Sequence, residues 1–335
     1  MTFIKPYISV IVILYNRNQY IEEALNSLEN QDLNKELYEV ILVANLNLNI
    51  NKTFLMNLKI INSSIKSGWG KYLQGLDNAS GEVISFLEDD DLFDKSKLSY
   101  LYNYFKKYNK LIYYKNNTLN FIDSNKIILN NYPKNTIKIF KNTKLLNYKK
   151  IIKMNHDYRL GFNTSSITIK RIILEKYKDY VPSDINIIFS FDSFLFYLAL
   201  EDGLDIIYDG RYLTYKRISN KNVSDEVNSS LLYSYISNSY FYYALIIGKF
   251  KNKEVQKVLQ RDILVSKNQL YLNMQINLSS KDMVLLFYNI FTPYFSLFIL
   301  GLFLRTFLKY YLPKSFKYID RIYKKIYEII KIKVF

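Results

Sequence analysis

Short apolar runs alternate with amphipathic segments along the first part of the chain. The run ISVIVIL is too short for a helix and has no polar face, which is typical of a strand buried in a parallel sheet. Four strands are expected here, at 8–14, 38–43, 58–61 and 83–87. Apolar residues at helical spacing predict a helix between the first two strands. This alternation predicts an α/β fold with a mostly parallel, Rossmann-like sheet flanked by helices.

The middle of the chain continues these patterns. A helix at 72–78 is expected to end at Gly81, because glycine adopts the left-handed C-cap conformation without strain. Residues 111–145 alternate apolar and polar positions between turn residues, which predicts strands or a hairpin. Residues 94–97 are expected to cap a helix that reaches about residue 108. Another helix is expected from 191 to 200, with Gly203 just past its end. In such sheets ligands bind beyond the carboxyl ends of the strands.

Beyond about residue 230 the strand patterns fade and aromatic helical patterns take over. We therefore divide the chain into an α/β domain at 1–228 and a helical region at 229–335. Residues 284–304 carry no charge and are long enough to span a membrane, although Asn289, Pro293 and Ser296 also allow an interfacial hairpin or a buried helix pair. The basic, amphipathic segment 305–335 favours contact with an anionic membrane surface over packing on this chain or on a second copy.

The composition restricts the chemistry of any site. The chain has no cysteine and a single histidine, His156, which excludes disulfides, thiol nucleophiles and multi-histidine metal sites. A metal would have to be held by oxygen atoms, which favours magnesium, manganese or calcium. The formal net charge is +16, and residues 231–335 hold 16 Lys/Arg against 5 Asp/Glu. Because these basic residues lie beside a hydrophobic run, a membrane is the expected partner and nucleic acid is not.

Four carboxylates in a row, Glu88, Asp89, Asp90 and Asp91, follow the fourth strand. Like charges this close repel one another, so a cation is expected to share them. In an extended segment, residues two apart point to the same side, so Glu88 and Asp90 are expected to face one cation together. A divalent ion there can also hold the two phosphates of a nucleotide diphosphate. The alternative is a solvated acidic turn that caps the helix beginning near Lys95.

The sequence SVIVILYNR followed by ASGEVISFLEDDDLF resembles the family 2 glycosyltransferases, and the resemblance covers roughly residues 7–225. It implies the GT-A fold, a D-x-D-type metal motif and inverting transfer of a sugar from a nucleotide-diphosphate sugar in one displacement step. By position, the resemblance implies that Glu88 and Asp90 hold a divalent metal, Mg²⁺ or Mn²⁺, with Asp91 as neighbour and Asp89 beside the donor.

The resemblance also implies a donor-binding surface. Tyr15 and Asn16, after the first strand, stand where the nucleotide base and ribose are bound. The second strand ends in Ala44-Asn45 and not in the usual acidic pair, so Asn45 is the candidate at that position. Lys71 stands in place of part of an Ala-Arg-Asn triplet, and Lys71 or Lys66 is a candidate for facing a phosphate. Arg217 is a further candidate, because a guanidinium matches phosphate geometry.

An inverting transfer needs a carboxylate that takes the proton from the attacking hydroxyl. In the family this acid lies in an acidic pair that opens a late helix, and here the matching residues are Phe191 and Asp192. The resemblance therefore implies that Asp192 is the catalytic base. An aspartate in this place is also an ordinary helix N-cap, and one residue can serve as both.

Together these features predict a glycosyltransferase acting on a glycan or lipid-linked acceptor. The amino-terminal apolar run lacks a cleavage site, so we expect a cytoplasmic enzyme held at the inner face of the cell membrane, with the carboxy-terminal helices as a possible homo-oligomer contact. The alternative is a catalytically inactive relative that binds nucleotide-sugars or scaffolds an assembly, because Ala44, Leu73 and Ser219 replace residues usual in the family.

Overall fold

The computed structural model describes residues 5–14, 18–45, 52–122, 127–128, 136–182, 190–218, 229–272, 278–290, 297–312 and 316. Its centre is a mixed sheet in the order β3-β2-β1-β4-β9-β6-β10-β5, with β7 on β6 and β8 on β10. The strands are β1 (Ile8–Ile13), β2 (Tyr38–Asn45), β3 (Asn57–Ser63), β4 (Val83–Glu88), β5 (Leu92–Phe93), β6 (Leu111–Phe121), β7 (Ile127–Ile128), β8 (Ile137–Phe140), β9 (Ile167–Lys170) and β10 (Asp205–Arg217). The α/β prediction is therefore confirmed.

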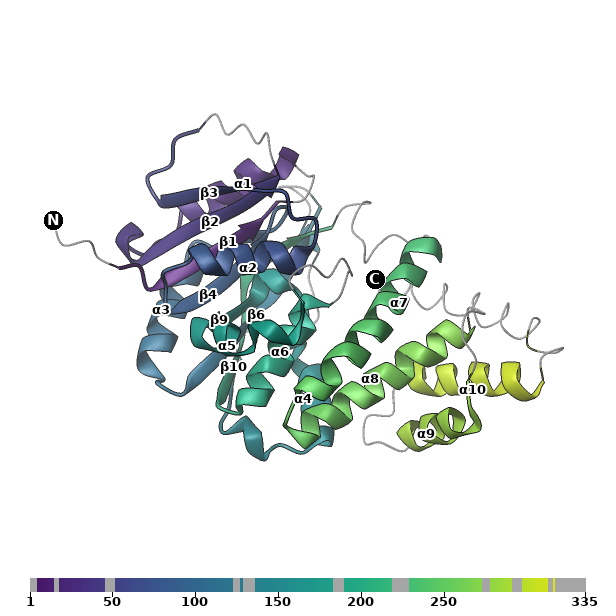
Figure 1. The fold of residues 1–335 in the computed structure, drawn as a ribbon. Coiled ribbons are helices and arrows are strands. Elements are labelled where there is room, and N and C mark those ends of the chain that lie inside the picture. Colours follow the sequence, from purple (N-terminus) through teal and green to yellow (C-terminus); the bar gives the residue numbers. More distant parts are fainter. Residues whose placement is uncertain are drawn as a thin grey trace.

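Helices cover both faces of this sheet (Figure 1). They are α1 (Asn18–Glu29), α2 (Gly68–Asn78), α3 (Lys97–Lys107), α4 (Tyr148–Tyr158), α5 (Arg171–Tyr177) and α6 (Phe191–Asp202), followed by α7 (Ser229–Ile246), α8 (Lys253–Leu272), α9 (Ser280–Ile290) and α10 (Leu297–Tyr311). The four predicted strands and the four helices predicted up to residue 200 are present, whereas most of the basic segment 305–335 lies outside the described residues. The second helix begins earlier than expected because Ser67 caps it by accepting from the Gly70 amide.

The sheet separates two hydrophobic cores. One lies between the sheet, α2, α4 and α6, and the other between the sheet, α1 and α3. Helix α6 is apolar all round and its residues 194–200 are buried, which explains why it reads as a continuous hydrophobic run. Gly203 ends it in the left-handed conformation, at φ 80°, as expected.

Gly81 corrects one expectation. It has no positive φ, and α2 instead ends at Ala79 in an extended conformation. A Cβ on Gly81 would lie 2.7 Å from the backbone nitrogen of Ser9. The glycine is therefore required by the close approach of the β4 entry to β1 and not by a helix cap.

Helices α7 and α8 belong to the main core. Tyr242, Phe250 and Val258 share one buried cluster with α6, and Glu254 accepts a hydrogen bond from the Tyr148 amide at the start of α4. The division at 228/229 remains a prediction, but the first part of the helical region packs directly on the α/β part.

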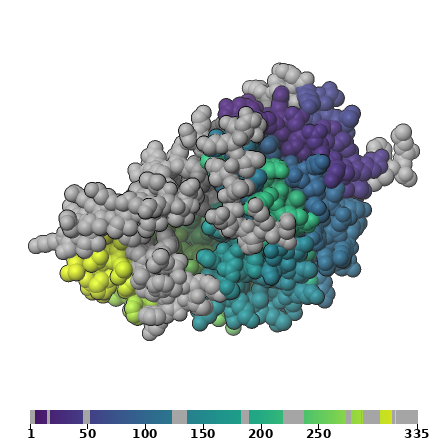
Figure 2. Space-filling view, turned by 180° about the vertical axis from the view of Figure 1, so that it is seen from behind, coloured from purple at the N-terminus to yellow at the C-terminus, as the bar shows by residue number. Residues whose placement is uncertain are grey.

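The uncharged stretch 284–304 contains parts of two helices, α9 and α10, which pack against each other. Within the described ranges, no helix is long and apolar enough to cross a bilayer. Figure 2 shows α10, in yellow, at the opposite end of the molecule from the purple amino-terminal strands. The basic segment beyond Phe316 lies outside the described residues.

Candidate active site

The carboxyl ends of the central strands meet at one edge of the sheet. Strand β1 pairs in parallel with β2 and β4, and Ile13 lies opposite both Val43 and Glu88. The strand ends therefore place Leu14, Asn45 and Glu88 at the same edge. This is the edge at which parallel α/β sheets bind ligands.

The four consecutive acids form a tight turn at this edge. The Asp91 amide donates to the Glu88 carbonyl at 3.2 Å, which closes the turn after β4. The expectation of an extended segment is therefore wrong, because residues 89 and 90 are the turn's central residues. Asp89, Asp90 and Asp91 are all buried, whereas Glu88 is partly exposed. A solvated acidic turn is also inconsistent with this burial.

Asp91 is held by donors from two other segments. Its Oδ1 accepts from the Arg217 amide at 3.0 Å, and its Oδ2 accepts from Asn163 Nδ2 at 3.2 Å. Burial raises the pKa of the Asp91 carboxyl, while hydrogen bonds from Ser165, Arg217 and Asn163 act in the opposite direction. These contacts fix the turn against the end of β10 and against the segment before β9.

Arg217 lies directly beside the acid turn. Its Nε donates to the Asp90 carbonyl at 3.1 Å and its Nη2 to Glu23 Oε2 at 2.6 Å. The guanidinium also lies over the rings of Tyr20 and Phe121, at 4.2 and 4.4 Å from their centroids. The guanidinium is therefore held beside the acid turn by four neighbours, and its binding of phosphate stays a prediction.

Asp192 occupies the first turn of α6, and Ser190 is the residue at the N-cap position. Its Oδ1 accepts from Ser190 Oγ at 2.5 Å and from the Ser193 amide at 2.8 Å. Its Oδ2 accepts from the Asn163 amide at 2.8 Å. Burial raises the pKa of the Asp192 carboxyl, and the hydrogen bonds and the charge of Lys115 oppose that rise.

Asn163 connects the two carboxylate centres, and sequence reasoning missed it. Its backbone amide binds Asp192 and its side-chain amide binds Asp91. It adopts φ 61° and ψ 100°, a conformation that asparagine tolerates better than most residues. The sequence GFNTSS signals only a turn at this point. In the structure, Asn163 of that loop connects the acid turn to the start of α6.

Two buried lysines were also missed. Lys97 Nζ donates to the Ser165 carbonyl and to Thr214 Oγ1, and burial lowers its pKa well below the usual range. Lys115 Nζ donates to the Asn116 carbonyl and to Ser166 Oγ, and burial lowers its pKa to about 7. Both residues lie in patterns that read as ordinary amphipathic elements, so the sequence carries no signal of their burial.

The remaining predicted donor-binding residues are placed as follows. Tyr15 and Asn16, like Ser219, lie outside the described residues. Asn45 is exposed at the end of β2. Lys71 is buried, its Nζ donates to the Leu14 carbonyl at 2.7 Å, and burial lowers its pKa. This contact with the end of β1 does not support the expectation that Lys71 faces a phosphate.

The acid turn offers an all-oxygen donor set for a metal. Across the described part of the chain, no three histidine, aspartate or glutamate side chains gather as a preformed metal site. Asp91 accepts protein hydrogen bonds on both oxygens, so it is suited to fixing the turn, and Glu88 and Asp90 stay the candidates predicted from the sequence for the ion. Carboxylate oxygens completed by substrate phosphates suit Mg²⁺ or Mn²⁺, so the residues fit such an ion.

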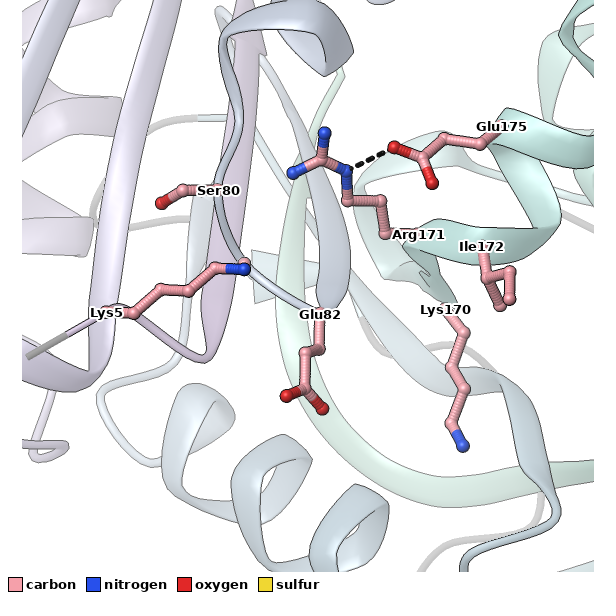
Figure 3. A pocket seen from close by; sticks show the side chains of 8 residues that line it. Lys5, Ser80, Glu82, Lys170, Arg171, Ile172 and Glu175 are labelled. Carbon is pink, nitrogen blue, oxygen red and sulfur yellow. Dashed lines mark hydrogen bonds and ion pairs between the residues drawn. The ribbon is translucent and has the colours of Figure 1, made fainter.

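A cavity of about 470 Å³ lies at the opposite, amino-terminal edge of the sheet, lined by residues that include Lys5, Glu82 and Arg171. Figure 3 shows these charged side chains around the opening, with the ion pair between Arg171 and Glu175. A smaller cavity of about 240 Å³ lies between α4, α6 and α8. Neither is lined by the acid turn.

The fold and the acid turn together define the class of protein. The structure resembles the crystal structure of S. aureus TarS 1-349 in complex with UDP-GlcNAc, with a TM-score of 0.57 and 17% identity over 90% of this chain and 79% of that one. It also resembles the mannosyltransferase PcManGT from Pyrobaculum calidifontis in complex with GDP-Man and Mn2+, with a TM-score of 0.54 and 14% identity over 92% and 88% of the two chains. The fold is therefore that of the GT-A glycosyltransferases.

The family follows from the sequence match. The model of glycosyl transferase family 2 matches residues 9–177, half of the chain, and the protein belongs to this family. A GalNAc(5)-diNAcBac-PP-undecaprenol beta-1,3-glucosyltransferase of Campylobacter jejuni is 37% identical over 105 residues, which are 29% of this chain and 33% of the relative. The poly(ribitol-phosphate) beta-N-acetylglucosaminyltransferase TarS of Staphylococcus aureus is 38% identical over 98 residues, 27% and 17% of the two chains. The match thus spans a third or less of these relatives.

Proposed function

We propose that the protein is a glycosyltransferase that moves a sugar from a nucleotide-diphosphate sugar to a hydroxyl of a glycan or lipid-linked acceptor, with inversion and in one displacement. The observation that carries this proposal is the bridge at Asn163, which ties the carboxylate of Asp192 to the acid turn at Asp91. A donor site and a base must lie side by side for a single displacement, and this bridge joins their two candidates.

Asp192 is the proposed general base. An effective base has a pKa near the operating pH, and burial raises the pKa of this carboxyl from its usual low value. The Asn163 and Ser193 amides hold both of its oxygens, so the carboxylate is oriented before an acceptor arrives. In this role it takes the proton from the acceptor hydroxyl as that oxygen attacks the anomeric carbon.

Glu88 and Asp90 are the residues that would hold the divalent metal, with Asp91 fixing the turn. The ion, when bound, neutralises charge on the diphosphate leaving group. Arg217 lies beside Asp90 with its charge partly shared with Glu23, and we assign it to the diphosphate. Tyr15, Asn16, Asn45 and Asp89 are assigned to the nucleotide side of the donor. Lys71 is assigned to the end of β1, next to that site.

The acceptor class is proposed from the relatives. The names of the Campylobacter and Staphylococcus enzymes specify a diphosphate-linked lipid glycan and a polyol-phosphate polymer. Phosphate groups are therefore part of both acceptors. We therefore propose a phosphate-bearing acceptor for this chain.

We also propose that the enzyme works at the cytoplasmic face of the membrane. Helices α9 and α10 present exposed apolar side chains, among them Val284, Leu304 and Phe307. In the sequence, these helices are followed by a basic segment. The test is sedimentation of the protein with vesicles. We expect the wild type to sediment with anionic but not with zwitterionic vesicles, and Leu304→Asn and Phe307→Asn to reduce sedimentation with the anionic ones. Equal sedimentation of all forms with both kinds of vesicle contradicts the assignment.

The function is tested with a panel of nucleotide-sugars. The purified full chain is incubated with each donor and Mn²⁺ or Mg²⁺, and the release of nucleotide diphosphate is measured with and without a chelator. We expect one donor to be turned over in a metal-dependent manner. Binding of a nucleotide diphosphate in calorimetry without turnover of any donor or transfer to an acceptor panel would instead identify a catalytically inactive binding protein.

A further inference from the structure

The cavity of about 240 Å³ between α4, α6 and α8 has an unusual lining. Apolar residues such as Phe162 and Phe196 form part of its wall, and three basic side chains, His156, Arg159 and Arg261, line it with a single carboxylate, Asp262. The three helices lie next to one another in Figure 1. The cavity is smaller than a typical pocket for a whole ligand, so it suits one group of a larger molecule.

The polar groups of this cavity favour an anion. Burial raises the pKa of Asp262, and Tyr197 donates to its Oδ2 at 2.6 Å, so the one carboxylate is already engaged. Arg261 makes only a long contact to Asp262, at 3.4 Å. The buried Nε of Arg261 makes no hydrogen bond to any described residue. A buried donor without a partner is rare in folded proteins and indicates a missing acceptor.

The cavity shares a loop with the proposed base. Residues 159–163 leave α4 with positive φ at Arg159 and end with positive φ at Asn163. Arg159 and Phe162 line the cavity, whereas Asn163 binds Asp192. The Gly161 carbonyl accepts from Ser193 Oγ at 3.1 Å, which fastens the loop to the first turn of α6. The same short segment, residues 159–163, therefore contacts both the cavity and the proposed base.

We propose that the cavity between α4, α6 and α8 binds a phosphate group of the acceptor and thereby places the acceptor hydroxyl near Asp192. Arg261 supplies the Nε–H and a guanidinium fork, which match phosphate oxygens, and Arg159 adds a second charge from the loop. The assignment to the acceptor rests on the proposed function, whereas the binding of phosphate rests on the cavity alone.

The direct test is a calorimetric titration of the full chain with inorganic phosphate, at an ionic strength held constant with sodium chloride. We expect saturable binding that Arg261→Gln weakens by about tenfold, the effect of losing one charge-assisted contact. Arg261→Lys keeps the charge but loses the fork, so it should bind with intermediate affinity. The matched control is Lys257→Gln on the same helix, whose side chain pairs with Glu254 and does not line the cavity.

The thermal unfolding midpoint of each variant is measured alongside. If Arg261→Gln does not fold, Arg159→Asn provides the second reading, because asparagine tolerates the positive φ at that position. Absence of saturable binding, or equal affinities in the wild type and the arginine variants, overturns the proposal.

Two soluble probes separate the sources of the phosphate group. Displacement of phosphate by glycerol phosphate assigns a polyol-phosphate acceptor, and displacement by geranyl diphosphate assigns a lipid diphosphate. If neither probe displaces phosphate, the acceptor assignment is overturned. Donor turnover is measured separately, without acceptor. If phosphate binds but no donor is turned over, the proposed function is wrong and the cavity is only an anion site. If a donor is turned over but phosphate does not bind, only this inference is wrong.

Discussion

The two edges of the central sheet hold their charged residues in different ways. At the amino-terminal edge, the cavity of about 470 Å³ is lined by charges such as Arg171 and Glu175, which form an exposed ion pair at 2.7 Å. At the carboxyl edge, Asp91, Lys97 and Lys115 are buried, and burial shifts the pKa of each one. Exposed ion pairs contribute little to stability or chemistry, whereas shifted pKa values gather at functional sites. The larger cavity is therefore the poorer candidate, and substitutions at the two edges should differ accordingly.

The largest difference is expected for Asp192→Asn at the carboxyl edge. The amide keeps a carbonyl oxygen for the Ser193 amide but cannot take a proton, so kcat should fall by roughly 10³-fold. The donor KM should change little, because Asp192 is assigned to the acceptor side. Initial rates of transfer measure both constants. A variant that retains a tenth or more of the wild-type kcat would remove Asp192 from the role of base.

Asp90→Asn should produce the next largest loss. If its carboxylate holds the metal, the variant loses roughly 10²-fold in kcat/KM, since such an ion supplies several kcal/mol of charge stabilisation. It should also require a higher Mn²⁺ concentration for half-maximal rate. The matched control is Glu82→Gln, the same chemical change at the other end of β4, and it should leave the rate within twofold of the wild type. Equal metal titrations for Asp90→Asn and wild type would contradict the assignment.

The bridge at Asn163 is tested with a pair of variants. Asn163→Gly removes the side-chain hydrogen bond to Asp91 and keeps the backbone conformation, so we expect a loss of about tenfold in kcat with a small change in melting temperature. Asn163→Ala loses the same bond and strains the positive φ by about 1 kcal/mol, so its melting temperature should be lower than that of the glycine variant. Identical rates in Asn163→Gly and wild type would show that the bridge is dispensable.

The smallest expected effect is a shift in pH dependence. The base must be ionised, so activity falls as the pH drops through the raised pKa of Asp192. Protonated Lys115 favours the ionised carboxylate, while Arg159 and Lys97 add positive charge around Lys115. Lys115→Met removes that support, raises the pKa of Asp192 further and should move the acidic limb of the kcat/KM profile to higher pH.

The control for this shift is Lys149→Met, the same substitution at an exposed position on α4. It should leave the pH profile unchanged. A profile for Lys115→Met that coincides with the wild type, or moves to lower pH, would show that Lys115 does not influence the base.

Two residues that depart from the family pattern, Tyr72 and Phe191, contact each other in the structure. Tyr72 lies in the segment that replaces the Ala-Arg-Asn triplet, and Phe191 replaces the acid before Asp192. Their rings stack with centroids 4.1 Å apart, and Phe86 and Trp69 pack against Phe191. Each departure alone suggests a lost polar function. Together they form an aromatic cluster beneath the start of α6, which explains how α6 and Asp192 are held in place without the usual acid.

The sequence by itself determined the order of strands and helices, the sheet edge that carries the acids, and the candidates Asp90, Asp192 and Arg217. Periodicity and residue type are local properties, so they can be read along the chain. The tertiary structure decided that the acids form a turn, that Lys71 faces Leu14, and that Asn163, Lys97 and Lys115 belong to the site. Burial and hydrogen-bond partners depend on segments more than 50 residues apart, such as 91 with 163 and 217, and the pKa values follow from that burial. No local pattern contains this information.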